Sequence, residues 1–143
     1  MKVEKLFTGL NTSAQGLSAQ RKRMNAIANN IANAETTRTE EGTPYRRKIV
    51  SMQSASTPSF IDAFDNIDGS SNSLQVNETE DMSDFKLIHD PTHPDADENG
   101  YVKMPNVNIV TEMVDMMSAS RAYEANVTVI NAQKQMAKDS LEI

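Results

Sequence analysis

The positions of the prolines constrain the fold of this chain more than any other feature of its sequence. All five prolines lie between Pro44 and Pro105, so residues 1–43 and 106–143 contain none. Proline lacks a backbone N–H and clashes with the preceding turn, and it therefore kinks or ends a helix. Both ends of the chain are free to form long helices, and the proline-containing middle is expected to be irregular.

The N-terminal end predicts a helix from about Val3 to Ala34. Apolar side chains recur there every seven residues, and a second, mixed row follows three residues later. The apolar row is Leu10, Leu17, Met24 and Ile31. The mixed row is Ser13, Gln20, Ile27 and Ala34. Gly9 and Gly16 each weaken a helix by about 1 kcal/mol relative to alanine, so the first turns need support from a neighbour.

The C-terminal end predicts a second helix, over residues 107–143, with a stronger apolar pattern. Asn106 or Asn108 can cap its start, and Glu112 suits its first turns because a carboxylate there faces the positive end of the helix dipole. Two rows with seven-residue spacing are mostly apolar. The rows are Ile109, Met116, Tyr123, Ile130 and Ala137, and Met113, Ser120, Val127, Lys134 and Leu141.

A chain that leaves along one long helix and returns along another places the two helices antiparallel. At 1.5 Å per residue each helix would be about 45–50 Å long. One pair of helices offers too little interface to bury such broad apolar stripes, so other chains are expected to cover them. The predicted fold is mainly α: long N- and C-terminal helices pair antiparallel as a coiled-coil-like hairpin, with a small, irregular, β-containing central insertion.

The middle of the chain is expected to form short strands. The candidate strands are residues 44–52, 74–79, 85–89 and 101–104. Residues 53–73 are rich in Ser, Asp and Asn, and Phe60, Ile61 and Phe64 are their expected apolar anchors. The predicted parts of the chain are the N-terminal helix at 1–34, the extended insertion and linker at 35–106, and the C-terminal helix at 107–143.

Composition excludes several classes of protein. The chain has no cysteine, which rules out disulfides, thiol nucleophiles and cysteine zinc sites. Its net charge of −6 disfavours a general nucleic-acid binder. No run approaches the ~18 apolar residues of a membrane span, and the N-terminus lacks the apolar run of a secretory signal peptide. The default expectation is a cytoplasmic protein, unless a specialised export machine reads another feature.

One acidic loop matches part of a calcium site. Residues 95–100, DADENG, correspond to the first half of an EF-hand loop, but Asn106 stands where a bidentate Glu is needed. His89 and His93 would need a helix to share a zinc ion, and Pro91 interrupts it. A solvated acidic turn and a rigid proline turn are the favoured interpretations, and no metal or cofactor is expected.

Neither catalysis nor phosphate binding is indicated by the remaining motifs. No serine lies in a G-x-S-x-G turn and no glycine-rich phosphate loop occurs, so no catalytic residue is expected. The basic clusters at 21–23 and 46–48 are interpreted as a solvated helix face and an edge strand. Their positive charge can also attract the acidic middle of another copy of the chain.

Four asparagines near the end of the N-terminal helix are unusual, because asparagine is a poor helix former. They are Asn25, Asn29, Asn30 and Asn33. One interpretation is a frayed helix end held by local side-chain hydrogen bonds. The other is a polar ladder that bonds to neighbouring helices and fixes their register, as a buried asparagine does in coiled coils.

Three segments of the sequence resemble a known family. Residues 23–48 hold the core A-N-N-I-A-N at 28–33, which is similar to the N-terminal signature of the bacterial flagellar rod and hook proteins. Residues 118–136 resemble the C-terminal signature of the same family, notably at Arg121, Tyr123, Glu124, Ala125 and Asn126. Residues 90–108 are similar to the linker of its proximal-rod members, and the short chain also fits those members.

This resemblance implies a structural, non-enzymatic subunit of the proximal rod. Its terminal helices would form the inner rod domain and polymerise helically to transmit torque from motor to hook. The resemblance also implies export by the flagellar type III apparatus without a cleaved signal peptide, and a periplasmic place in the flagellar basal body. The implied partners are copies of itself, other rod proteins, the export apparatus and the surrounding basal-body ring, with no nucleic acid and no direct membrane span.

Subunit contacts are expected to use the apolar rows and the signature asparagines. The expected interface residues are Leu10, Leu17, Met24, Ile27, Asn29, Asn30, Ile31, Asn33, Met113, Met116, Tyr123, Asn126, Val127 and Ile130. The alternative is a soluble coiled-coil adaptor that binds a single partner through the C-terminal helix, which predicts a stable monomer or closed dimer in dilute solution. A calcium-responsive loop at 95–100 is a third hypothesis, which a calcium titration would test.

Overall fold

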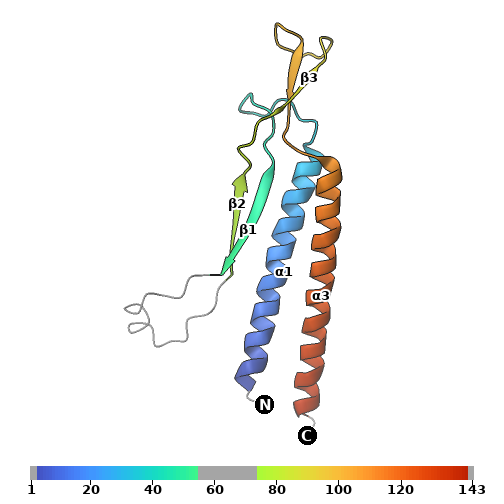
Figure 1. Ribbon diagram of the computed structural model, residues 1–143. Helices are drawn as coiled ribbons and strands as arrows, with labels where there is room; N and C mark the ends of the chain where they lie inside the picture. The colour runs from blue at the N-terminus through green and yellow to red at the C-terminus, as the bar shows by residue number, and fades with distance from the viewer. Residues whose placement is uncertain (1–2, 55–73, 142–143) are drawn as a thin grey trace, which may run out of the picture.

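The computed structural model describes residues 3–54 and 74–141, which form two long helices and two small antiparallel sheets (Figure 1). Helix α1 spans Val3–Ala32 and helix α3 spans Ile109–Leu141. The strands between them are β1 at Lys48–Ser54, β2 at Leu74–Glu80, β3 at Lys86–His89 and β4 at Tyr101–Met104. The predicted apolar anchors Phe60, Ile61 and Phe64 lie outside the described residues. Neither described helix has the length and apolar character that crossing a bilayer requires.

The helices α1 and α3 lie side by side and run in opposite directions, so both chain termini lie at the same end of the molecule (Figure 1). Midway along the pair, Gly16 of α1 is close to Asn126 of α3: a Cβ on this glycine would lie 3.2 Å from the Asn126 Nδ2 atom. Near the other end, the Asn30 side chain donates a hydrogen bond to Glu112. The pairing therefore extends over several turns of each helix.

The row of α1 that contacts α3 lies one residue before the predicted apolar row. The contacting residues are Gly9, Gly16, Arg23 and Asn30. Glycine allows a close approach of the facing side chains, and the two polar residues find partners on α3. The predicted apolar row that begins at Leu10 is half-buried beside this contact, and Ile27 of the mixed row is buried.

Helix α3 divides into an inner and an outer face. Ala119 is completely buried, and half-buried residues on the same face are the last four members of one predicted row, whose first member, Ile109, is 41% exposed. These half-buried residues are Met116, Tyr123, Ile130 and Ala137. Met113, which begins the other predicted row, is 55% exposed because it points away from α1. Part of the apolar pattern of α3 is therefore not used within the single chain.

The four strands form two separate hairpins, and their positions agree closely with the prediction. In the first, β1 pairs with β2 in the register Lys48↔Glu80 to Ser54↔Leu74 and lies along α1. Strand β1 begins four residues later than expected, because Tyr45 still belongs to the turn after α1, where its N–H donates to the Thr36 carbonyl. The second hairpin, β3 with β4, extends beyond the helix pair at the end opposite the termini (Figure 1).

The acidic loop between β3 and β4 is held by hydrogen bonds between its own residues. The Asp97 carboxylate accepts hydrogen bonds from the N–H groups of Asn99 and Tyr101, and Gly100 has a φ of 77° that favours glycine. The Asp90 carboxylate accepts two bonds from Thr92, which lower the Asp90 pKa below its usual value. Within residues 3–54 and 74–141, no three acidic or histidine side chains are grouped as metal ligands.

Candidate functional site

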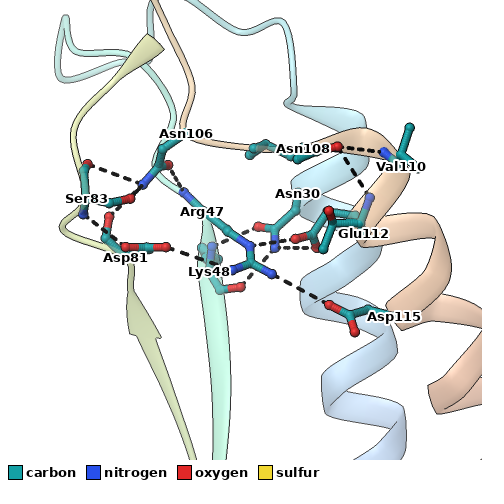
Figure 2. Close-up of polar contacts among 12 residues, drawn as sticks. Asn30, Arg47, Lys48, Asp81, Ser83, Asn106, Asn108, Val110, Glu112 and Asp115 are labelled. Atoms are coloured by element: carbon teal, nitrogen blue, oxygen red, sulfur yellow. Dashed lines mark hydrogen bonds and ion pairs between the residues drawn. The ribbon is translucent and has the colours of Figure 1, made fainter.

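A cluster of polar side chains joins four parts of the chain at the start of α3 (Figure 2). It connects the last turns of α1, the first residues of β1, the turn between β2 and β3, and the first turns of α3. Its central residue is Glu112, whose carboxylate is only 1% exposed. A buried carboxylate is costly unless it is paired and hydrogen-bonded, so the surrounding residues decide whether this arrangement is stable.

Two residues bind the Glu112 carboxylate, one on each oxygen. Oε1 accepts a 2.6 Å hydrogen bond from the Arg47 Nε atom, and Oε2 accepts a 2.9 Å bond from Asn30 Nδ2. The first bond is charge-assisted and short, as expected for a guanidinium and a carboxylate. Glu112 thus ties the start of β1 and the end of α1 to the first turns of α3.

Asn30 uses all of its hydrogen-bonding capacity in this cluster. Besides Glu112, its Nδ2 donates to the Lys48 carbonyl at 2.9 Å, and its Oδ1 accepts from the Lys48 N–H at 2.8 Å. The same oxygen accepts a 3.0 Å bond from the Tyr45 hydroxyl, whose pKa is raised mainly by burial. The amide therefore bonds to Lys48 as a neighbouring strand would, which fixes where β1 begins relative to α1.

Arg47 lies among three carboxylates. In addition to Glu112, it approaches Asp115 at 3.7 Å and Asp81 at 3.9 Å, and its side chain is 27% exposed. Asp115 also pairs with Arg23 of α1 at 3.5 Å. The positive charge of Arg47 compensates the buried acid, and the exposed part of the guanidinium reduces the cost of removing it from water.

The asparagines Asn106 and Asn108 have different roles at the start of α3. The Asn108 Oδ1 atom accepts hydrogen bonds from the N–H groups of Val110 and Thr111, so this residue caps the helix. Asn106 instead joins two other segments: its Oδ1 accepts the Arg47 N–H at 2.8 Å, and its Nδ2 donates to the Asp81 carbonyl at 2.9 Å. Of the two predicted caps, Asn108 is the correct one.

The signature asparagines separate into two kinds. Asn30 bonds to neighbouring elements, as the polar-ladder hypothesis predicted. Asn33 bonds locally, since its Nδ2 donates to the Asn29 carbonyl at 2.9 Å and its Oδ1 accepts from the Thr36 hydroxyl at 3.2 Å. The side chains of Asn25 and Asn29 are exposed. The polar-ladder hypothesis therefore fits Asn30, and the hypothesis of local hydrogen bonds fits Asn33.

The expected interface residues differ in how exposed they are in the single chain. Ile27 is 6% exposed and Asn30 is 1% exposed, so both are largely covered by their own chain. Met113 and Asn29 are exposed. The half-buried residues are Leu10, Leu17, Met24, Ile31, Asn33, Met116, Tyr123, Asn126, Val127 and Ile130. Most of the set thus retains surface that another chain can contact.

Arg47 was not among the residues predicted for this site. Residues 46–48 were expected to lie on an edge strand, whereas Arg47 pairs with a buried acid and the Arg46 guanidinium lies 4.3 Å from the centre of the Phe85 ring. Lys48 pairs with Glu78 across the hairpin at 3.0 Å, which raises the Lys48 pKa. Glu112 was noticed as a first-turn acid, but its partner lies 65 residues away and local patterns do not identify it.

Two family models match the ends of the chain. Residues 10–38 match the model described as flagella basal body rod protein. Residues 98–143 match the model described as flagellar basal body rod FlgEFG protein C-terminal. The two matches include most of α1, the β4 strand and the whole of α3. They therefore contain Asn30 and Glu112, but not Arg47.

Three curated proteins illustrate how far the similarity extends. Each is a flagellar basal-body rod protein FlgC. The chain is 48% identical to those of Bacillus subtilis and Borreliella burgdorferi, and 40% identical to that of Salmonella typhimurium. Each alignment covers 96% of this chain and 97% of the relative, so the similarity includes both helices and the insertion between them.

Proposed function

Because the chain belongs to the FlgC family of flagellar basal-body rod proteins, we propose that it builds the proximal rod through helical polymerisation of its terminal helices. Membership makes it a structural, non-enzymatic subunit of the flagellar basal-body rod, which assembles with other basal-body components. We also propose where it lies within the rod, which of its residues contact neighbouring subunits, and by which export route it reaches the rod.

The observation that supports polymerisation best is the apolar surface that the single chain leaves open on α3. Val110, Met113, Val114 and Met117 are each more than half exposed, and they follow one another on a single face of the helix. Exposed apolar patches of this kind mark sites of protein interaction. A subunit that lies among other rod subunits would bury them, whereas an isolated chain would expose them to water.

The two long helices are proposed to act as one coiled-coil-like unit, the inner rod domain at 1–34 and 107–143, with the insertion at 35–106. The close approach at Gly16 and the bonded pair Asn30 and Glu112 support this pairing. Torque would pass along the helix pair and across the polar cluster, in which Arg47 joins the insertion to α3. A cluster with many short polar bonds resists relative movement of the segments it joins.

Within the rod, the expected interface residues are proposed to act in two ways. Ile27 and Asn30 would hold α1 in position from inside the chain. The half-buried and exposed residues would touch neighbouring subunits directly, among them Leu17 on α1 and Val127 on α3. The neighbours would be copies of this chain, other rod proteins and the surrounding basal-body ring.

Export through the flagellar type III apparatus is proposed as the route to a periplasmic rod, without a cleaved signal peptide. The absence of cysteine supports this route, because a chain that is threaded unfolded forms no disulfide that would block its passage. The periplasmic place of the rod then requires the export apparatus as a transient partner.

The proposal is tested in a flagellated strain that lacks its own FlgC. The chain is expected to restore swimming and to be present in purified basal bodies. Leu17→Asp is expected to abolish both while the protein is still made, because a charge on the half-buried row opposes packing against other subunits. Met82→Asp, at a 77% exposed position outside the helices, serves as the control. Absence of the wild-type chain from the basal bodies would contradict the proposal.

A further inference from the structure

Helix α3 carries two separate apolar stripes that its own chain leaves exposed. The first stripe is Val110, Met113, Val114 and Met117, with exposures of 55–71%. The second stripe is Ala125, Val129, Ala132 and Met136, all exposed, with Val129 at 44% and Met136 at 45%. Neither stripe contains a charged or polar residue, so water contacts an uninterrupted apolar strip in both places.

The two stripes differ in position along and around the helix. Their centres are about 17 residues apart, which is about 25 Å at 1.5 Å per residue. At about 100° per residue, they face directions roughly a quarter turn apart. Helix α1 covers neither of them, because it packs on the face of Ala119 and Glu112, which is opposite the first stripe and roughly a quarter turn from the second. A surface outside this chain is therefore needed to cover each stripe.

The shapes of the stripes suit each other. The methionines and valines of the first stripe project as large side chains at helical spacing. In the second stripe, Ala125 and Ala132 leave room between the larger Val129 and Met136. Large side chains that fit between small ones are the basis of helix packing at 8–10 Å. The second stripe of another copy is thus a matching occupant for the first stripe.

Charge at the stripe ends selects the direction of docking. Arg121 lies one turn beyond Met117 on the line of the first stripe, is exposed, and forms no ion pair within the described residues. Asp139 lies one turn beyond Met136 and is also exposed. If the two helices run parallel and are shifted by about 18 residues, Arg121 of one copy meets Asp139 of the next. An opposite-charge pair at this place favours the parallel arrangement.

We propose that the first stripe of one copy docks on the second stripe of another, with the two α3 helices parallel and shifted by about 27 Å. The inference rests on the proposed function and adds the surface that two copies use. Each copy contacts one neighbour through its first stripe and another neighbour through its second stripe. The contact is therefore heterologous, and each new copy presents a free stripe to the next. The result is an open, stepwise assembly.

Cross-linking in basal bodies tests this contact, because the chain has no natural cysteine. The shift of about 18 residues places Val114 of one copy opposite Ala132 of the next. The variant with both Val114→Cys and Ala132→Cys is expected to give a ladder of cross-linked dimers, trimers and longer chains with a short bifunctional thiol reagent. Either change alone is expected to give none. Lys134→Cys in place of Ala132→Cys is the control, because Lys134 is exposed on a different face.

Each other outcome overturns the inference. Products that stop at dimers, or dimers from Val114→Cys alone, would indicate a closed contact between identical stripes. Basal bodies that contain the double variant but give no cross-link would overturn the inference and leave the proposed rod function intact. If the chain without any substitution is also absent from basal bodies, this result would instead contradict the proposed rod function.

Charge reversal provides a second measurement that does not depend on cysteine variants. Arg121→Asp and Asp139→Arg, each alone, are expected to lower the amount of chain in basal bodies at least several-fold. The two changes together are expected to restore most of it, because the opposite pair is re-formed with its charges exchanged. A combined variant no better than the single ones would overturn the proposed shift.

Discussion

The Arg47 guanidinium and the Glu112 carboxylate form a 2.6 Å ion pair in which the acid is 1% exposed and the base is 27% exposed. The two residues are 65 positions apart: Arg47 directly precedes β1, and Glu112 lies in the first turn of α3. The pair therefore links the insertion to the returning helix at the point where the chain changes direction. The strength of this ion pair should therefore affect how firmly the two helices are held together.

Removal of this carboxylate is expected to destabilise the protein. Glu112→Ala leaves the Arg47 side chain and the Asn30 amide without their acceptor in a largely buried place. The free energy of unfolding should fall by about 2–3 kcal/mol, since Arg47 keeps some contact with water and two other carboxylates nearby. Urea unfolding of the purified chain measures the change. Glu124→Ala, at an exposed position of the same helix, should stay within about 0.5 kcal/mol.

Two adjacent asparagines offer a matched comparison. Asn30→Asp keeps the shape of the side chain but replaces the donor to Glu112 with a second carboxylate, so two like charges face each other and the donor to the Lys48 carbonyl is lost. We expect a loss of about 3 kcal/mol at neutral pH. Asn29→Asp makes the same change at an exposed position and should have little effect. Equal melting temperatures for the two variants would contradict the assigned role of Asn30.

The elements themselves could be predicted from the sequence because their signals are local. The proline distribution places the long helices at the ends, and aromatic and β-branched residues such as Tyr101 and Val102 identify strands such as β4 at Tyr101–Met104. The first helix ends at Ala32, two residues before the expected end. Such signals lie within each element and do not depend on what the element packs against. The predicted boundaries of the helices and strands were therefore close to the observed ones.

The helix contact could not be predicted in the same way. The apolar rows were expected to make the subunit contacts, without a distinction between contacts within one chain and contacts between chains. In the structure, α1 turns Gly16 and Asn30 toward α3 and leaves Leu10 half-buried beside them. An apolar pattern marks surfaces that become buried, without indicating whether the same chain or another buries them. In a subunit that leaves part of its apolar surface exposed, the pattern therefore cannot distinguish the two uses.

The cap of α3 provides a further test. Asn108→Ala removes the oxygen that accepts the N–H groups of Val110 and Thr111. Loss of a cap costs about 1 kcal/mol, and amide hydrogen exchange in the first turn of α3 should become faster. Asn106→Ala should leave that turn unchanged and instead loosen the link to Asp81. The reverse pattern of exchange would show that Asn106 is the cap.

The pKa of Asp90 gives a pH-dependent prediction. Hydrogen bonds from the Thr92 hydroxyl and N–H hold it below the usual value of 3.8, so the folded β3–β4 loop favours the ionised form. This contribution to stability is present above the usual pKa and is lost as the pH falls through the lowered one. Thr92→Val removes the hydroxyl but keeps the N–H, and the Asp90 pKa should rise part of the way toward its usual value.

An NMR titration of the Asp90 carboxyl carbon measures this change directly. Thr43→Val, in another loop, should leave the titration of Asp90 as it is in the unmodified chain. An unchanged Asp90 pKa in Thr92→Val would mean that the hydroxyl is not the cause of the shift.

The close approach of the two helices predicts a strict size limit at Gly16. A Cβ there would already lie 3.2 Å from the Asn126 Nδ2 atom, so the branches of a valine have no space unless the helices move apart. Gly16→Val should lower the free energy of unfolding by about 1–3 kcal/mol, although valine is the better helix former. Ala14→Val, two residues earlier on the exposed face, should cost only about 0.5 kcal/mol. Urea unfolding of both variants compares the positions, and equal stability would show that α1 and α3 are not held at this distance.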